Sequence, residues 1–566
     1  MNNFFVSKVK LLQGKLPLQS KDPLQYLQKF MSGKTAKFEL RQVHPDEVMS
    51  ILRSLKNSRS TGWDFIDVDI IKMIAPFILP SLTHIVNLSI TNSFFPTEWK
   101  KAKIVPLLKK GNALQPQNYR PVALLPVLSK VLEKVVFKQI MEYVENNKIL
   151  HPSHHGSRPN HSTGTALIEM YTSWIDAVEA GQVAAVMMLD LSAAFDLVDH
   201  NLLLCKLEIM GFQTHALKWM KSYLNDRSQC VYIDGHFSEY LPVTVGVPQG
   251  SVLGALLYIL FVNELPEVAC SDTVGDKLND GGESLCAYVD DSTCTITGLD
   301  PFDLSRNLAN KYKQLASFFG DNKLVINNEK TQLLILGPKK YSDIRDKVVL
   351  DTGTVVISPS QTGKLLGLNI HESMKWKSHL VSGPLSLISN LSKRLNAVKR
   401  VSSNASFKTR LQVANACFIS VLTYLIIIWG GTQDYLLKPL QVIQNRAARC
   451  VTRLSWYTPT RILLKQCGWL SLKQLIFFHT AVQIWKIQKT KQPSSISLKL
   501  QTSITRSGAE GNLLVSTYET DIGRKSFLVR GQTTWNRVPV NIRSSKNKKS
   551  FKNKLKQWVQ ANVSID

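Results

Sequence analysis

Two short apolar runs along the chain share an unusual form, because each of them ends directly on acidic residues. Residues 184–189 are apolar throughout and are followed by Asp190, and residues 285–289 are followed by Asp290 and Asp291. Apolar runs of this length predict buried strands. A further strand-like segment follows the second pair of acids, which is typical of a β-hairpin with both acids at its turn. Pairing the first strand beside that hairpin would gather three carboxylates at one edge of a sheet.

Elsewhere the spacing of apolar residues predicts an alternation of helices and strands. Helices are expected at 43–55, 68–95 (interrupted at Pro80), 129–146, 191–210, 249–265 and 302–320. Strands are expected at 102–108, 333–336 and 348–357, and a hairpin joins 231–235 to 241–245. Residues 271–283 form a polar, glycine-rich loop, and the pattern from about 376 to 490 is mainly helical. The chain is therefore predicted to have an α/β fold.

Composition narrows the class of protein. At 566 residues the chain is too long for one compact core and fits several subdomains. Its net charge of +27 points to a polyanionic partner, although a solvated basic surface would give the same count. The eight cysteines are scattered without a close Cys-x-x-Cys pair, which argues against a zinc knuckle and for reduced thiols. We expect an intracellular protein, in the nucleus or the cytoplasm.

The apolar segment 413–429 approaches the ~20 residues that span a membrane. It is short for a span and contains the polar residues Asn415, Ser420 and Thr423. We interpret it as a buried helix and expect no membrane partner.

The acids suggest a specific chemistry. Three crowded carboxylates repel one another unless a divalent cation neutralises them. The simplest interpretation is a two-metal site for nucleotidyl transfer, with Asp190 and Asp290 as the principal ligands. Two Mg²⁺ ions suit a site of few carboxylates plus substrate phosphates, with Mn²⁺ as an alternative ion. The competing interpretation is that Asp290 and Asp291 merely form a turn, which Asp favours.

Several blocks resemble, in this order, the reverse transcriptase of non-LTR (LINE-type) retrotransposons, in particular the jockey-like animal elements. They are Asn-Tyr-Arg-Pro-Val at 118–122, Leu-Asp-Leu-Ser-Ala-Ala-Phe-Asp at 189–196, Gly-Val-Pro-Gln-Gly-Ser at 246–251, Tyr-Val-Asp-Asp at 288–291, the segment 327–331 and Leu-Gly-Leu at 366–368. The similarity continues through 440–449 and 535–539, so it covers nearly the whole chain. An isolated Asp-Asp pair would be weak evidence, whereas six ordered blocks are strong evidence.

The resemblance implies a right-hand polymerase with fingers, an α+β palm with a further strand near 364–370, a helical thumb and a basic C-terminal helical region. The expected divisions are 1–36 (a linker or truncated upstream segment), 37–370 (fingers and palm, core motifs about 100–370), 371–490 (thumb-like helices) and 491–566 (a Ser/Thr-rich linker and basic region). The implied reaction is RNA-templated DNA synthesis from dNTPs on a primer 3′-OH. The implied partners are the RNA template, the DNA primer or target and the dNTPs.

The resemblance also gives roles to individual residues near the acids. Asp291 would be the supporting third metal ligand. Phe195 would be a steric gate against a ribose 2′-OH, although helix packing would also explain its ring. Lys330 would protonate the leaving pyrophosphate as a general acid, unless it is a surface lysine. The expected nucleotide-binding residues are Arg120, Lys109 (or Lys103), Phe195, Gln249 and Gly250; the forked donors of Arg suit phosphate.

Basic residues in the last third of the chain are candidates for binding nucleic acid. Lys438, Arg446, Arg449 and Arg453 recur near the spacing of one helix face, with Trp429, Trp456 and Tyr457 available for stacking. The basic tail around Lys548 and Lys549 could bind RNA, direct nuclear import or simply be solvated, and these alternatives stay open.

Some departures from the family pattern are visible. Val289 stands where many relatives have Ala, and Leu425 where Gly is common. We find no endonuclease or RNase H acid constellation, so we expect a polymerase part of an element, with an endonuclease supplied by a separate polypeptide as one option. The rival interpretations are a catalytically silent relic that serves as an RNA-binding scaffold, and a maturase-like or telomerase-like polymerase.

Overall fold

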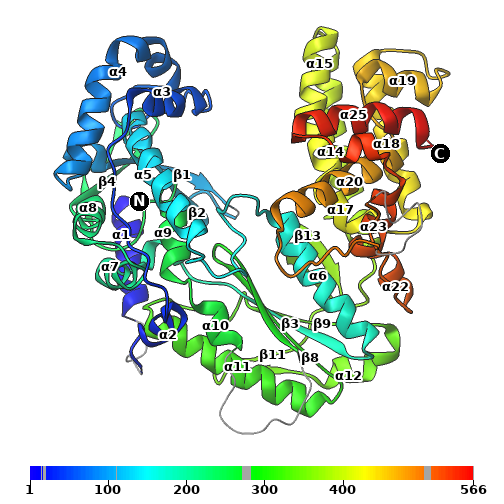
Figure 1. Ribbon diagram of the computed structural model, residues 1–566, viewed down its shortest axis with the longest axis horizontal. Helices are drawn as coiled ribbons and strands as arrows, with labels where there is room; N and C mark the ends of the chain where they lie inside the picture. Colours follow the sequence, from blue (N-terminus) through cyan, green and yellow to red (C-terminus); the bar gives the residue numbers. More distant parts are fainter. Residues whose placement is uncertain (15, 17–20, 110, 271–281, 502–510, 565–566) are drawn as a thin grey trace.

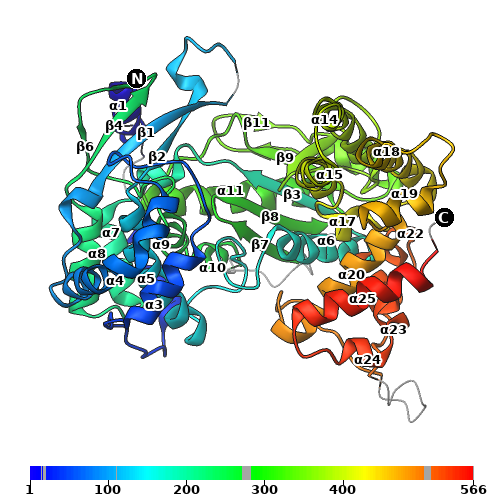
Figure 2. The ribbon, with the colours of Figure 1, turned by 90° about the horizontal axis from the view of Figure 1, so that it is seen from above.

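The computed structural model describes residues 1–14, 16, 21–109, 111–270, 282–501 and 511–564. Almost all of the predicted polar loop at 271–283 therefore lies outside the described residues. Figure 1 shows a central sheet with one arm of helices on each side, and Figure 2 gives the view at right angles. The chain starts in one arm and ends in the other.

The central sheet has four antiparallel strands, in the spatial order β7 (Glu283–Tyr288), β8 (Asp291–Gly298), β3 (Val183–Leu189) and β9 (Gln332–Leu336). Every residue of β3 is buried. Its side chains alternate between a core that includes helix α11 (Pro301–Asp321) and a core that includes helix α6 (Thr163–Glu179). Burial on both faces explains why this strand is apolar without alternation, as predicted for 184–189.

A second sheet lies in the first arm. Its strands are β2 (Tyr119–Leu124), β1 (Lys101–Leu108), β4 (Arg227–Ile233), β5 (His236–Phe237) and β6 (Leu241–Val243). Helix α1 (Asn2–Gln13) packs on this sheet through the buried ring of Phe5. The interpretation of residues 1–36 as a linker is therefore wrong, because α1 and α2 (Gln25–Met31) both contribute side chains to hydrophobic cores.

The other helices of the first arm are α3 (Pro45–Ser54), α4 (Val68–Thr91), α5 (Val127–Asn146), α7 (His200–Ile209), α8 (Thr214–Leu224), α9 (Gly254–Phe261) and α10 (Leu265–Cys270). The predicted break at Pro80 is wrong. Helix α4 continues through Pro76 and Pro80, both of which are exposed, while its opposite face is buried. Among the described helices, α4 is the one that is long and apolar enough to cross a membrane, but a helix with a face in a protein core passes the same test.

Two further predicted helices are shorter than expected. Residues 191–210 contain a short 3-10 helix, η3 (Ala194–Leu197), before α7 begins. Residues 249–253 form a loop, so the segment 249–265 becomes helical only in α9, and Pro266 lies inside α10 instead of ending the previous helix. The loop takes this course because it is bonded to other elements, as described below.

Small hairpins connect the sheet to the second arm. The predicted strand 348–357 is a hairpin of β10 (Leu350–Asp351) and β11 (Val356–Ile357) preceded by α12 (Ser342–Lys347). The strand predicted near 364–370 is the hairpin of β12 (Thr362–Leu365) and β13 (Leu368–His371). In both cases a tight turn, at Gly353 and at Gly367, lies inside what was predicted to be one strand.

The second arm is helical, as predicted from 376 onward. Its elements are α13 (Lys377–Leu380), α14 (Leu387–Ser402), α15 (Phe407–Ala414), the π-helix η5 (Asn415–Ile419), α16 (Ser420–Leu422), α17 (Ile426–Trp429), α18 (Asp434–Thr452), α19 (Thr460–Cys467), α20 (Leu472–Thr490), α22 (Asp521–Arg524), α23 (Phe527–Arg537), α24 (Val540–Arg543) and α25 (Lys548–Asn562). Side chains of α23 and α25 share one core with α18 and α20. The C-terminal region is therefore packed into this arm.

Candidate functional site

The register of the central sheet brings the three predicted acids to one edge. Leu189 at the end of β3 pairs with Ser292 of β8, so the next residue, Asp190, lies level with Asp291. Tyr288 pairs with Asp291 across the hairpin, which leaves Val289 and Asp290 at the turn. The sheet edge predicted from the two apolar runs is therefore present.

The acids influence one another electrostatically. Burial raises the pKa of Asp290, and the charge of Asp190 raises it further, while Arg120 and Lys109 oppose the shift. Burial also raises the pKa of Asp291, together with the charges of Asp290 and Asp190. Both carboxylates are still exposed at the surface, so a ligand can reach them. A group of mutually repelling, accessible carboxylates fits a divalent cation.

The acids do not form a closed metal cage. Within the part of the chain that the structure describes, no three His, Cys, Asp or Glu side chains are grouped closely enough to hold a metal ion by themselves. Asp190 Oδ2 accepts a hydrogen bond from Lys330 Nζ at 3.2 Å. An open set of carboxylates is compatible with Mg²⁺, which takes few protein ligands and completes its shell with water and substrate phosphates.

Arg120 and Lys109 lie at the end of the β1–β2 hairpin. Leu107 pairs with Arg120, and Lys109 N–H donates to the carbonyl of Asn118 at 2.8 Å. Both cationic side chains are exposed, and both lower the pKa of Asp290 by their charge. The alternative candidate, Lys103, is corrected: its side chain is buried, with Nζ over the rings of Phe65 and Tyr232, so it does not reach the surface where Arg120 and Lys109 are exposed.

Phe195 lies on η3, immediately after β3. Its ring stacks on the ring of Tyr258 at a centroid distance of 5.0 Å and an interplanar angle of 26°. The pKa of the buried Tyr258 is raised by burial and by the charges of Asp290 and Asp291. The Tyr258 hydroxyl group, whose ring stacks on Phe195, therefore lies within electrostatic range of these two acids.

The loop with Gln249 and Gly250 is held between η3 and β2. Gly246 N–H donates to Val198 O at 2.9 Å, and Gln249 O accepts from Ala123 N–H at 2.9 Å. Gly246 has φ +87° and Gly250 has φ +119°, and a Cβ atom on either would lie 2.6–2.7 Å from backbone oxygen. These glycines are required both by the left-handed backbone and by the close approach of neighbouring chain.

Two side chains that orient this loop were not assigned a role from the sequence. Asp196 Oδ1 accepts from Gln249 Nε2 at 2.8 Å, and burial raises the pKa of Asp196. His200 Nε2 is 2.8 Å from Gly246 O. Asp196 is the last residue of the block at 189–196, so its conspicuous position in that block was the available signal.

Glu133 is a third unassigned residue. It is fully buried on α5, and its Oε2 accepts from the N–H groups of Val252 and Leu253 at 2.8 and 3.2 Å and from the hydroxyl of Tyr223 at 3.2 Å. Glu133 thus holds the end of the loop that carries Gln249 in place through two backbone N–H groups. A single acid in the apolar face of the predicted helix 129–146 was the signal that could have identified it.

Glu133→Ala is expected to lower the free energy of unfolding by about 1–3 kcal/mol or more, because it leaves buried N–H groups without an acceptor. Glu142→Ala, on the exposed face of the same helix, should change it by less than about 0.5 kcal/mol. Urea denaturation followed by circular dichroism measures both. Equal effects for the two variants would contradict the role given to Glu133.

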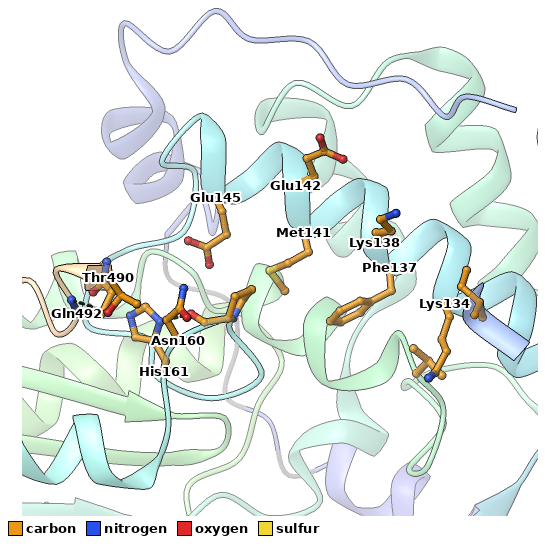
Figure 3. A pocket seen from close by; sticks show the side chains of 13 residues that line it. Lys134, Phe137, Lys138, Met141, Glu142, Glu145, Asn160, His161, Thr490 and Gln492 are labelled. Atoms are coloured by element: carbon orange, nitrogen blue, oxygen red, sulfur yellow. Dashed lines mark hydrogen bonds between the residues drawn. The ribbon is translucent and has the colours of Figure 1, made fainter. Parts of the chain in front are cut away.

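Two hollows border the first arm. One, of about 470 Å³, is lined by Gln249 and Asp196 together with residues of α1 and β4. The other, of about 680 Å³, lies between α5 and residues 159–161 and 490–492, and Figure 3 shows Phe137, Met141 and Glu145 pointing into it from α5. The larger hollow contains none of the predicted site residues, so the sheet edge remains the candidate centre.

The predicted nucleic-acid-binding residues differ in their surroundings. Arg446, Lys548 and Lys549 are exposed. Arg449 instead lies over the ring of Trp456 at 4.6 Å and donates to its carbonyl. Arg453 donates to the carbonyls of Ser402 and Ser403. The prediction that Trp429 is available for stacking is wrong, because its side chain is fully buried. Trp456 and Tyr457 are exposed.

Comparison with known proteins agrees with this geometry. The family model described as "Reverse transcriptase (RNA-dependent DNA polymerase)" matches residues 107–370, a range that contains all the candidate residues of the sheet edge. The chain is 27% identical over 444 residues (78% of this chain, 48% of the relative) to the probable RNA-directed DNA polymerase from transposon BS of Drosophila melanogaster.

It is also 24% identical to the RNA-directed DNA polymerase from mobile element jockey (75% of this chain, 45% of the relative) and 25% identical to the probable RNA-directed DNA polymerase from transposon X-element (73% and 44%), both of Drosophila melanogaster. The chain thus spans about half the length of these relatives. Residues 107–370 thus match the reverse transcriptase family, and over about three quarters of its length the chain is similar to RNA-directed DNA polymerases of jockey-like non-LTR elements.

Proposed function

We propose that this protein is the RNA-directed DNA polymerase of a non-LTR retrotransposon, which extends a primer 3′-OH with dNTPs on an RNA template. The observation that carries the proposal is the register of β3 and β8, which sets Asp190 level with Asp291 beside Asp290. Arg120 and Lys109 lower the pKa of Asp290, so cationic groups suited to a triphosphate lie within electrostatic range of the acids. The family match over residues 107–370 supports this reading.

In this proposal the central sheet is the palm, the first arm provides the fingers and the second arm is the thumb, as the two-armed shape in Figure 1 suggests. The primer and template would lie between the arms, over the sheet edge. Exposed basic residues of the second arm, Arg446, Lys548 and Lys549, would contact phosphates of the nucleic acid. We place this activity inside the cell, and we leave the cutting of target DNA to a separate endonuclease activity.

Asp190, Asp290 and Asp291 would hold two Mg²⁺ ions, which when bound stabilise the attacking and the leaving oxygen atoms. Arg120 and Lys109 bind the triphosphate and orient it toward the primer end. Lys330 Nζ, held 3.2 Å from Asp190 Oδ2, is a donor that can give its proton to the leaving pyrophosphate. Gln249, fixed by Asp196, contacts the forming base pair.

Phe195→Ala is expected to increase incorporation of ribonucleotides relative to deoxyribonucleotides by about 10²-fold. The reason is that removal of the ring opens space for a 2′-OH that the stacked pair of Phe195 and Tyr258 would exclude. Single-nucleotide insertion with matched rNTP and dNTP measures the ratio, and Phe302→Ala, at an exposed ring on α11, is the control. A ratio unchanged in Phe195→Ala would refute the assignment of the gate.

The proposal is tested by extension of a DNA primer annealed to an RNA template, with Mg²⁺ and four dNTPs. We expect extension to the template end by the wild-type chain and none by Asp290→Ala. If the wild-type chain gives no more product than Asp290→Ala but still binds the RNA, the silent RNA-binding scaffold becomes the better account. Extension on a DNA template but not on the RNA template would contradict RNA-directed synthesis.

A further inference from the structure

The segment between α5 and α6 runs beside the outer edge of the central sheet. Its residue His154 forms a parallel bridge with Ala287 of β7. His155 N–H donates to Ala287 O at 2.9 Å, and Ala287 N–H donates to Ser153 O at 3.0 Å. The segment therefore acts as an added edge strand, and it pairs with β7 just before the turn that carries Asp290.

Gly156 follows this added strand and lies against that turn. A Cβ atom on Gly156 would lie 2.3 Å from Val289 Cγ2 and 2.7 Å from Val289 N. A side chain at this position would require the turn to move, because the backbone nitrogen of Val289 lies in the way as well as its Cγ2 methyl group. The need for glycine at this position is therefore a need for space next to the turn.

The turn itself is strained. Val289 has φ +61°, in the left-handed region that β-branched residues rarely adopt. Such a conformation persists only where the surrounding structure holds it. Val289 lies directly before Asp290, so a change in its backbone angles would move the Asp290 carboxylate relative to Asp190.

Arg158 fastens the segment to the first arm. Its Nη1 donates to the carbonyls of His151 and His154 at 2.9 and 3.0 Å. Its Nε and Nη2 form a two-pronged contact with Glu145 of α5 at 2.8 and 3.0 Å. Only 6% of the Arg158 side chain is exposed, and Figure 3 shows Glu145 projecting from α5 toward the loop with Asn160 and His161. The segment thus has a fixed support on its side away from the sheet.

A second support comes from α6. His155 Nδ1 is 3.1 Å from Thr165 Oγ1, and His155 Nε2 is 3.4 Å from Glu169 Oε2. Both contacts hold the backbone whose N–H group donates to Ala287. The segment is therefore anchored on both helices that flank it.

We infer that residues 153–158 are a positioning element for the catalytic turn, in which Gly156 gives the turn the space it needs and Arg158 fixes the segment against α5. Neither residue touches substrate. The inference rests on the proposed polymerase function and adds to it the reason that Asp290 is held in place.

The test compares Gly156→Ala with Gly282→Ala at the opposite end of β7, where a Cβ atom would meet only ordinary contact at 3.6 Å. Single-turnover insertion on the RNA template should show kcat of Gly156→Ala lowered about 10²-fold, because misplacement by about 1 Å can cost that much. KM for dNTP and the Kd for primer–template should stay within about twofold of the values for Gly282→Ala. Adding Val289→Ala to Gly156→Ala, which removes the Cγ2 contact, should recover part of the lost kcat.

If Gly156→Ala does not fold, Arg158→Lys carries the test, since Lys keeps the charge but lacks the two-pronged contact. Its kcat should fall at unchanged KM, and its melting temperature reports whether the fold is intact. Activity of Gly156→Ala, or of Arg158→Lys where that variant carries the test, equal to that of Gly282→Ala would overturn the inference while leaving the polymerase proposal standing. If Gly156→Ala raises KM as well as lowering kcat, and Val289→Ala recovers neither, the segment has only a structural role and the inference is overturned. An inactive wild-type chain would instead contradict the proposed function.

Discussion

Asp290→Asn is expected to reduce primer extension by about 10³-fold or more, while the melting temperature of the metal-free protein rises. The activity is lost because the substitution removes one of the anions that would hold the cations. Without the cations, the charge that develops during the reaction is no longer stabilised. The stability rises because burial and the charge of Asp190 disfavour the ionised carboxylate, as the raised pKa of Asp290 indicates. Loss of function with gain of stability is the signature of a site arranged for a ligand and not for the fold.

The sign of the pH dependence follows from linkage. The ordinary pKa of an Asp is near 3.8, and the pKa of Asp290 in the folded chain is higher. Between these two values the folded chain binds more protons than the unfolded chain, so stability falls as the pH rises through that window. Asp290→Asn should make the fall smaller in melting curves recorded with a chelator. Asp343→Asn, at an exposed acid on α12, is the control and should leave it unchanged. A lower melting temperature for Asp290→Asn at neutral pH would contradict this account.

The second large effect is expected at the buried ion pair of Lys206 and Glu264. Both side chains have no exposed surface, and Lys206 Nζ also donates to Phe261 O at 2.6 Å. Burial lowers the pKa of Lys206 and raises that of Glu264, so each charge depends on the other. Lys206→Met should lower the free energy of unfolding by about 3–5 kcal/mol, because it leaves Glu264 buried without its partner.

Urea denaturation of Lys206→Met and of the double variant Lys206→Met, Glu264→Gln separates the causes. The double variant should be the more stable of the two, since Gln carries no charge into the core. The loss of unfolding free energy in the single variant should grow as the pH rises. Glu264 without its partner must then either carry a buried charge or stay protonated at a pH where the unfolded chain is ionised. A single variant within about 1 kcal/mol of the wild-type chain would show that the pair is not a determinant of stability.

The parts of the fold that the sequence predicted are those set by local pattern. Strand β3 is buried on both faces and is therefore apolar throughout, and the hairpin with Asp290 at its turn follows from two strand-like runs that meet. A run of this kind reports its surroundings directly, because each of its side chains enters one core or the other. The strand register then brings Asp190 to its partners.

The parts that were missed depend on contacts between distant segments. The loop at 249–253 has a helix-like sequence but is held in place by Glu133 from α5. Pro80 reads as a break, yet α4 passes through it because the opposite face of the helix is packed in the core. Gly156 gives no signal by itself, since what it requires is set by Val289, more than a hundred residues later.

One departure from the family pattern has a structural explanation. Leu425, at a position where the resemblance suggested that Gly is common, has φ +52° and precedes α17. A glycine would adopt this left-handed conformation without strain. Residues 407–422 are helical without interruption, through the π-helix η5, so the segment 413–429 departs from the single predicted helix at 423–425, just before α17.

The central claim is that carboxylates far apart in the chain jointly hold a pair of divalent ions, and Mn²⁺ electron paramagnetic resonance tests it most directly. With primer, RNA template and dNTP bound, the wild-type chain should bind two Mn²⁺ ions whose spectra show magnetic coupling, as expected at a separation of about 3.5–4 Å. Asp190→Asn should abolish the coupling. Two uncoupled ions in the wild-type chain, or a spectrum that Asp190→Asn leaves unchanged, would contradict the account.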